Sequence, residues 1–367
     1  MKPFFLSLEK IFLEGLTIGF THIPSVRTIA CCVDTKARCK IQNLKQFNGY
    51  QACGYCLHPG HLTSKGQIKY GYLKEKQTRN HSDTVQAMAL SDARGVPVNG
   101  VKGISPLIFI PDFDVVEYCP IDYMHGVLLG VTKQLCKIWF EKPNTPSYIK
   151  SHIGHIDNIL NTIAPFKEAS RSARKISDRR SWKANEWLHW LLHYSSVCLR
   201  NILPARYYNH YRILVVVITD LLQNKISGEM LNSCNLKLEN FVADFEILYT
   251  LNEMNYNVHL LTHIVNWCKN FGPLWAFSLF FFEDINGVLK NYVKGPNEPL
   301  LQIADRCAMS HARYNLDRST ELGTAAMLLC QKITCSRKIV AKNTHIIYRQ
   351  ILLMHAVKAI SSKSCHV

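Results

Sequence analysis

"FNGYQACGYCLHPGH", residues 47–61, places Cys53 and Cys56 three positions apart, with His58 and His61 close behind. A Cys-x-x-Cys pair is half of a zinc site, a redox pair, or a coincidence in a chain with 14 cysteines. No thioredoxin-like βαβ pattern surrounds the pair, which disfavours the redox interpretation. His58 and His61 are local candidates for further ligands, although their Pro-Gly turn can equally be exposed surface.

A better second half of a metal site lies far along the chain, in "HLLTHIVNWCKNFGP", residues 259–273. His259 and His263 are four positions apart on an expected helix, so both rings share one face. Each can instead be an ordinary core or surface histidine. Combined with Cys53 and Cys56, they predict a closed Cys₂His₂ site, which is typical of structural zinc.

Two carboxylates occur in unusual surroundings. Glu283 stands within the aromatic run "FSLFFFEDINGVL" (277–289), where burial is costly unless the group is paired or bound to a metal. Asp34 ends the apolar stretch "RTIACCVD" (27–34), which we expect to be a strand leading into a helix. The simpler alternatives are that Glu283 reaches solvent at a helix edge and that Asp34 caps the following helix.

A third motif, "CPIDYMHGVLLGVTK" (119–133), sets Asp122 and His125 three positions apart. This spacing puts both side chains on one helical face, where they can form a hydrogen-bonded pair. A capping aspartate beside an incidental histidine is the alternative.

The charge balance points to a polyanionic partner. The 43 Lys and Arg residues against 27 Asp and Glu residues give a net charge of +16, which favours nucleic acid or an anionic surface. A basic protein without such a partner is the alternative. We expect no membrane span, because Glu9 and Glu14 interrupt the N-terminal apolar stretch and the other apolar runs are too short. The cysteines are then reduced thiols of the cytosol or nucleus.

Apolar residues at helical spacing predict a first helix over 3–19 and a mainly helical middle. The strongest helical stretches are 119–140, 181–203, 211–226, 238–251 and 275–293. Residues 60–108 are polar and rich in glycine, serine and asparagine, which indicates a long loop. Beyond about residue 305 the chain becomes a basic, partly helical tail.

Four stretches together resemble the transposase of CACTA-type (En/Spm) DNA transposons, in its metazoan-like form. They are "QFNGYQACGYCLHPG" (46–60), "CPIDYMHGVLLGVTKQL" (119–135), "SWKANEWLHWLLHYS" (181–195) and the stretch 259–295, which begins "HLLTHIVNWCKNFGP" and includes "LFFFEDINGVLKNYVKG". The likeness extends from about residue 2 to about residue 305. This family is similar to the V(D)J recombinase within the RNase H-like three-carboxylate transposases.

The resemblance implies a predominantly helical α+β fold, in which a partial RNase H-like core is interrupted by a large helical insertion. The implied segments are a partial core with a zinc half-site (1–58), the insertion (59–255), the part completing the core (256–305) and the tail (306–367). It also implies roles for particular residues. Asp34 and Glu283 would be catalytic ligands of Mg²⁺, Asp122 and His125 would support them, and Cys53, Cys56, His259 and His263 would bind a structural zinc ion.

Such transposases cleave and join DNA with two Mg²⁺ ions held by three carboxylates. Only Asp34 and Glu283 match here, and we expect the first carboxylate upstream of this chain, as in an N-terminally truncated gene product. We therefore expect the 367 residues to be inactive alone, with DNA as partner and the nucleus, otherwise the cytoplasm, as location; a homo-oligomer stays open. The alternative is a non-enzymatic, zinc-stabilised relic that binds nucleic acid or protein. A poorly folding pseudogene product is the third hypothesis.

Overall fold

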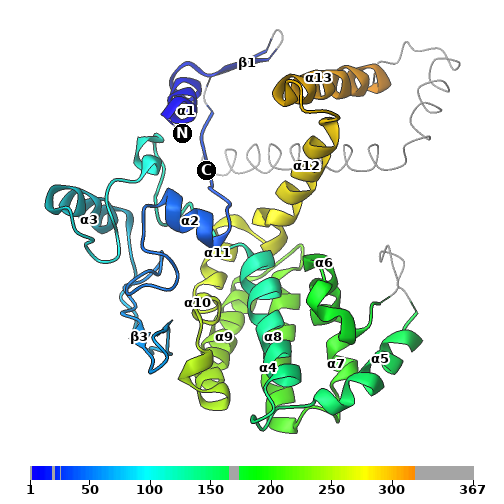
Figure 1. Ribbon diagram of the computed structural model, residues 1–367. Coiled ribbons are helices and arrows are strands. Elements are labelled where there is room, and N and C mark those ends of the chain that lie inside the picture. Colours follow the sequence, from blue (N-terminus) through cyan, green and yellow to red (C-terminus); the bar gives the residue numbers. More distant parts are fainter. Residues whose placement is uncertain (1, 19–20, 25, 165–172, 319–367) are drawn as a thin grey trace, which may run out of the picture. The chain divides into compact units, whose positions relative to one another are not determined.

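The computed structural model describes residues 2–18, 21–24, 26–164 and 173–318 (Figure 1). The chain divides into two units, Met1–Leu279 and Phe280–Val367. Both the cysteine pair and the histidine pair belong to the first unit. The segment boundaries expected at 58, 255 and 305 stay predictions. The part of the expected tail beyond residue 318 lies outside the described residues.

Helices dominate the described chain, so the predominantly helical α+β class is confirmed. In the first unit the α-helices are α1 (Lys2–Glu14), α2 (Thr35–Ile41), α3 (His81–Arg94), α4 (Lys133–Glu141), α5 (Ile153–Thr162), α6 (Ala184–His189), α7 (Ser195–Cys198), α8 (Ala205–Leu221), α9 (Gly228–Tyr249), α10 (Tyr256–Leu260) and α11 (Ile264–Phe271). The π-helices η2 (Met124–Thr132) and η5 (Trp190–Tyr194) join them, with 3₁₀ turns η1 (Pro106–Phe109), η3 (Lys150–His152), η4 (Ile176–Ser181), η6 (Leu251–Glu253) and η7 (Leu274–Phe277). Helix α12 (Leu279–Tyr292) starts at the last residue of this unit, and α13 (Pro299–Arg318) lies in the second. No described helix combines the length and apolar character needed to cross a membrane.

Two short antiparallel hairpins make up the sheet structure of the described residues. Strand β1 (Leu16–Ile18) pairs with β2 (Thr21–Ile23), and β3 (His61–Leu62) pairs with β4 (Ile68–Lys69). The strand expected over 27–34 is wrong: these residues are irregular, and the Cys31 N–H donates to the Tyr118 carbonyl while the Asp34 carbonyl accepts the Arg38 N–H at the start of α2. A β-branched apolar run becomes a strand only where a partner edge offers a ladder of hydrogen bonds.

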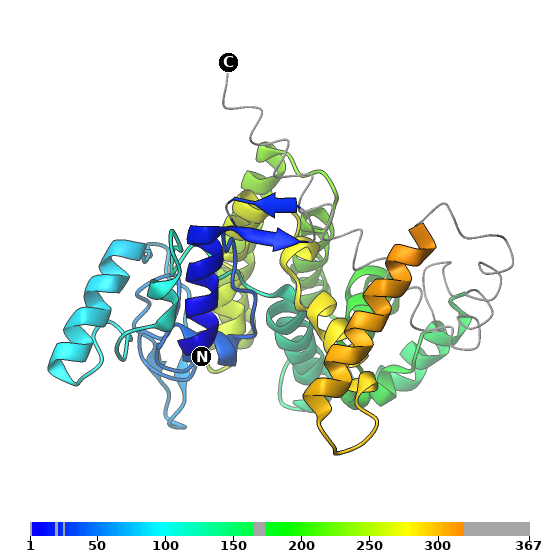
Figure 2. The same ribbon diagram turned by 90° about the horizontal axis from the view of Figure 1, so that it is seen from above.

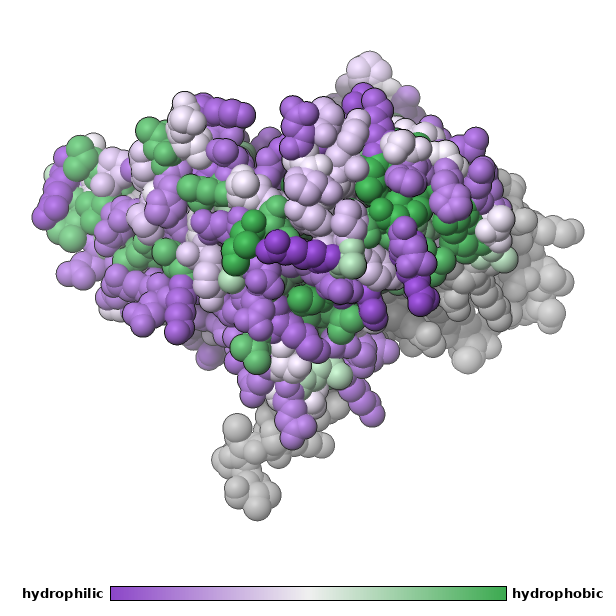
Figure 3. Space-filling model, turned by 90° about the horizontal axis from the view of Figure 1, so that it is seen from below, coloured by the Kyte–Doolittle hydropathy of each residue, from purple (hydrophilic) through white to green (hydrophobic). Residues whose placement is uncertain are grey.

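The core of the first unit is built on α8 and α9, which pack against each other. Their buried residues recur at three and four positions, as in Leu214, Val217 and Ile218 of α8. In α9, Phe241 and Phe245 follow the same spacing and are fully buried. This periodicity is why the helical expectation for both segments is confirmed. Hydrophobic residues also reach the surface, in patches among hydrophilic ones (Figure 3).

Helix α3 lies inside the stretch expected to be a loop, so that expectation is wrong over His81–Arg94. Asn80 caps its first turn by accepting the Asp83 N–H at 2.8 Å, and Gly95 ends it at φ +66°. The helix lies at one edge of the first unit, away from α8 and α9 (Figures 1 and 2). Few of its residues are buried, which explains why no apolar periodicity revealed it.

Candidate metal centre

A tight loop presents the two cysteines. The Gln51 N–H donates to the Pro59 carbonyl at 3.2 Å and closes the loop, and the Tyr55 N–H points at Cys53 Sγ at 3.5 Å. Arg79 fixes the loop from outside, because its Nε donates to the Cys53 carbonyl at 2.7 Å and its Nη2 donates to the Gln51 carbonyl at 2.9 Å. Cys53 and Cys56 are both fully buried.

The two histidines come from a break between helices. His259 belongs to α10, whereas His263 precedes the first residue of α11. The single helix expected here is therefore wrong: between them the chain makes a tighter turn, in which the His263 N–H donates to the Leu260 carbonyl at 3.0 Å. The four-residue spacing still brings both rings to one side, with their Nε2 atoms 3.3 Å apart.

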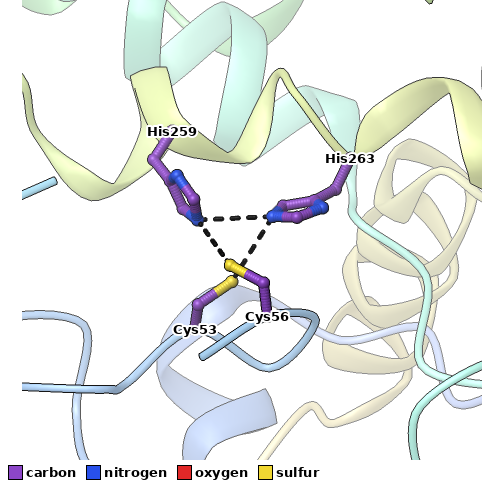
Figure 4. A group of neighbouring side chains, drawn as sticks. All are labelled: Cys53, Cys56, His259 and His263. Carbon is purple, nitrogen blue, oxygen red and sulfur yellow. Dashed lines mark hydrogen bonds between the residues drawn. The ribbon is translucent and has the colours of Figure 1, made fainter. Parts of the chain in front are cut away.

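The four side chains converge on one point (Figure 4). Cys53 Sγ lies 3.7 Å from His263 Nε2, and Cys56 Sγ lies 3.4 Å from His259 Nε2. All four ligand atoms lie within 4.8 Å of one another. A tetrahedral zinc ion would separate sulfur from nitrogen by about 3.6 Å and nitrogen from nitrogen by about 3.3 Å. The group can therefore hold a metal ion, and its spacing is compatible with zinc.

The pKa values of Cys53 and His259 are shifted toward the forms that bind a cation. Burial opposes ionisation of Cys53, but the neighbouring Cys56 thiol and the two imidazoles outweigh it and hold the pKa of Cys53 well below its ordinary value. The hydrogen bond between Cys56 and the Cys53 sulfur in turn raises the pKa of Cys56, and burial and the nearby Cys53 charge act in the same direction. Burial lowers the pKa of His259, which keeps that ring neutral and able to coordinate.

His58 lies against the cluster but is not one of its ligands. Its Nδ1 accepts the Gly60 N–H at 2.9 Å, and its Nε2 donates to the Gly71 carbonyl at 2.7 Å, so both nitrogens are occupied. Burial lowers the pKa of His58 to about 4, which favours this neutral form. His61 is exposed on β3. The local alternative is thus excluded for His58, whose ring instead packs edge-on against His259.

Tyrosine rings enclose the cluster. Tyr70 stacks on His259 with ring centroids 5.4 Å apart, and its hydroxyl donates to the Gly49 carbonyl at 2.6 Å. Tyr55 lies against His263 at 5.6 Å. These aromatic neighbours could not be predicted from the sequence, because only the folded chain brings them to the histidines.

Asp122 and His125 form the pair that their spacing suggested. The ring Nδ1 of His125 lies 2.6 Å from an Asp122 carboxylate oxygen. Asp122 is buried and also accepts the backbone N–H groups of Met124 at 3.3 Å, His125 at 2.9 Å and Leu279 at 2.9 Å. The carboxylate therefore caps the start of η2 and joins it to the first residue of α12.

Asp34 occupies the position described above as a helix cap. Its carboxylate accepts the Ala37 N–H at 2.7 Å at the start of α2. Glu283 lies on α12, as expected, within the second unit. Asp34 belongs to the first unit, so the joint magnesium site of the two carboxylates stays a prediction.

The candidate metal centre is thus the strongest functional feature of the described chain: four side chains that could hold a metal ion, three buried and His263 half-buried, from segments about two hundred positions apart. Comparison of the sequence with protein-family models and with curated proteins found no match.

Proposed function

We propose that this chain is a transposase-derived, zinc-stabilised DNA-binding protein related to CACTA-type (En/Spm) transposases. One observation carries the proposal. The four residues that the resemblance assigns to zinc, Cys53, Cys56, His259 and His263, bring their ligand atoms within 4.8 Å of one another although about two hundred positions separate the pairs.

The metal in this proposal is structural zinc. Two cysteines and two histidines fill all four tetrahedral positions, which leaves no open site for a substrate or a reactive water molecule. Its task is to join the cysteine loop to the α10–α11 turn. An RNase H-like core around this junction is part of the proposal.

DNA is the proposed partner, and the nucleus the proposed location. The net charge of +16 supports a polyanion, because basic side chains gain affinity by releasing the counterions condensed on DNA.

Strand cleavage is, in this proposal, an activity of the ancestral transposase. Asp34 and Glu283 would bind Mg²⁺, with Asp122 and His125 as supporting groups. Two carboxylates do not complete a three-carboxylate site, so we expect no cleavage by this chain alone. The capping bond from the Ala37 N–H engages the Asp34 carboxylate and favours the second candidate, a non-enzymatic, zinc-stabilised relic that binds nucleic acid or protein.

Metal analysis and DNA binding test the proposal together. Purified protein should contain one zinc ion per chain, and its affinity for duplex DNA should fall steeply as salt rises. The same preparation, supplied with Mg²⁺ or Mn²⁺, should not nick DNA. Nicking that disappears in Asp34→Asn and Glu283→Gln would instead establish the enzymatic version. Protein that is free of zinc and indifferent to DNA would refute both.

A further inference from the structure

A cavity of about 380 Å³ opens beside the metal centre. The metal ligand His263, together with Tyr55 and Trp267, lines its inner wall. The exposed residues Lys74 and Lys269 also line it. The volume falls in the range of small-ligand sites, so the cavity can take one nucleotide unit or a similar group.

Arg79 offers a hydrogen-bond donor to this cavity. Its side chain is 7% exposed, and its Nε and Nη2 atoms donate to the carbonyls of Cys53, Gln51 and Asn99. Its Nη1 atom makes no hydrogen bond to any described residue. Arg79 lines the cavity, so its guanidinium keeps donor capacity beside this space. A guanidinium held in place by carbonyls is well prepared to bind an anion.

The other charges of the cavity leave it positive. Four cationic side chains line it against the two carboxylates of Glu117 and Glu239. Glu239 is occupied by Lys76, whose Nζ lies 2.6 and 2.8 Å from its two oxygens. Glu117 accepts the Asn270 side-chain amide at 2.8 Å. Lys74 and Lys269 form no ion pair with any described residue, so their charges are available to attract an anionic ligand into the cavity.

We propose that this cavity binds a phosphate group of the DNA backbone, between Arg79 at its inner end and Lys74 and Lys269 at its opening. Arginine and lysine are the residues that contact backbone phosphates, and two thiolates neutralise a zinc ion, so the metal centre does not repel the anion. The inference rests on the proposed function and specifies where DNA touches the protein. Because His263 lines the cavity, the metal that orders His263 also shapes this contact.

The test compares two double variants that lose the same charge. Lys74→Ala/Lys269→Ala removes the lysines at the cavity, and Lys150→Ala/Lys225→Ala removes two exposed lysines that do not line it. Arg79 is left unchanged, since it also holds the cysteine loop. Duplex DNA binding is followed by fluorescence anisotropy over a salt series, and zinc content shows that each variant keeps its metal centre.

Loss of this one phosphate contact should reduce the slope of log Kobs against log salt by about 0.9. It should also weaken binding by the cavity variant about fivefold near 0.15 M salt. The control variant should change little. Equal DNA binding by both variants, with the wild type still salt-sensitive, would overturn this inference and leave the proposed function standing.

Inorganic phosphate and a mononucleotide form a second arm, titrated by calorimetry. If the wild type does not bind DNA but binds these anions through Lys74 and Lys269, the cavity is a site for free phosphate compounds and the DNA assignment is refuted. If the wild type binds neither DNA nor phosphate, the proposed function and this inference both fail.

Discussion

Removing the proposed metal ion should destabilise the first unit more than any single surface change. The perturbation is a chelator, or the variants Cys56→Ser and His263→Ala, each of which removes one of the four converging ligands. Without the ion, the buried sulfur and nitrogen atoms lose the partner that offsets their removal from water.

The size of the effect follows from the length of chain that the metal closes. Cys53 and His263 are 210 positions apart. A cross-link over a loop of that length removes about 18 cal/mol/K of entropy from the unfolded chain, or about 5 kcal/mol at 25 °C, if a metal clip acts like a disulfide. Folded proteins are stable by about 5–15 kcal/mol, so this is a large share of the total. At about 2 °C per kcal/mol for a unit of this size, Tm should fall by about 10 °C or more.

Thermal unfolding and metal content measure this prediction. Protein with and without chelator is melted by circular dichroism, and metal is counted by atomic emission. His61→Ala and Cys307→Ser are matched controls, because both residues are exposed and neither is a ligand. These two variants should keep one metal ion and the wild-type Tm.

Two outcomes would refute the reasoning. Metal-free protein that melts within about 3 °C of the metal-bound form would show that the ion does not cross-link the folded chain. Full metal retention by both Cys56→Ser and His263→Ala would show that the ion binds elsewhere.

Three further predictions concern the surroundings of the site and the core. Gly100→Ala should lower the free energy of unfolding in urea by roughly 2–3 kcal/mol, because Gly100 has φ +79° and the added Cβ would lie 1.9 Å from the Gln51 carbonyl oxygen. As a control, Gly154→Ala lies on a helix with open space around it and should raise the free energy of unfolding by about 0.5–1 kcal/mol. Burial lowers the pKa of His210 to about 4. The free energy of unfolding should therefore decrease by about 3 kcal/mol at most as pH falls from the unfolded-state pKa of about 6.5 toward 4. His210→Phe should flatten that part of the pH profile. Asp122→Ala should lower the free energy of unfolding by roughly 3 kcal/mol in urea melts, because the carboxylate accepts three backbone N–H groups; an effect below about 1 kcal/mol would contradict its capping role.

Most of the structural features that could be predicted followed from the short-range spacing of residues along the chain. Apolar residues at three and four positions predicted α8 and α9, since one face of each helix is buried along its length. The spacing of Asp122 and His125 likewise predicted their contact. Apolar spacing did not predict helix α3, because few of its residues are buried. Its ends nevertheless carry the caps Asn80 and Gly95.

The sequence by itself determined which side chains could bind a metal, because residue type and local spacing fix ligand chemistry and the sharing of a face. Only the tertiary structure decided that Cys53 and His263 meet across 210 positions and that His58, with both nitrogens occupied, stays outside the ligand set. It also decided that Asp34 closes no strand and caps α2 instead. The physical reason is common to all three: such contacts depend on how distant segments pack, and packing is a property of the whole fold that no short stretch encodes.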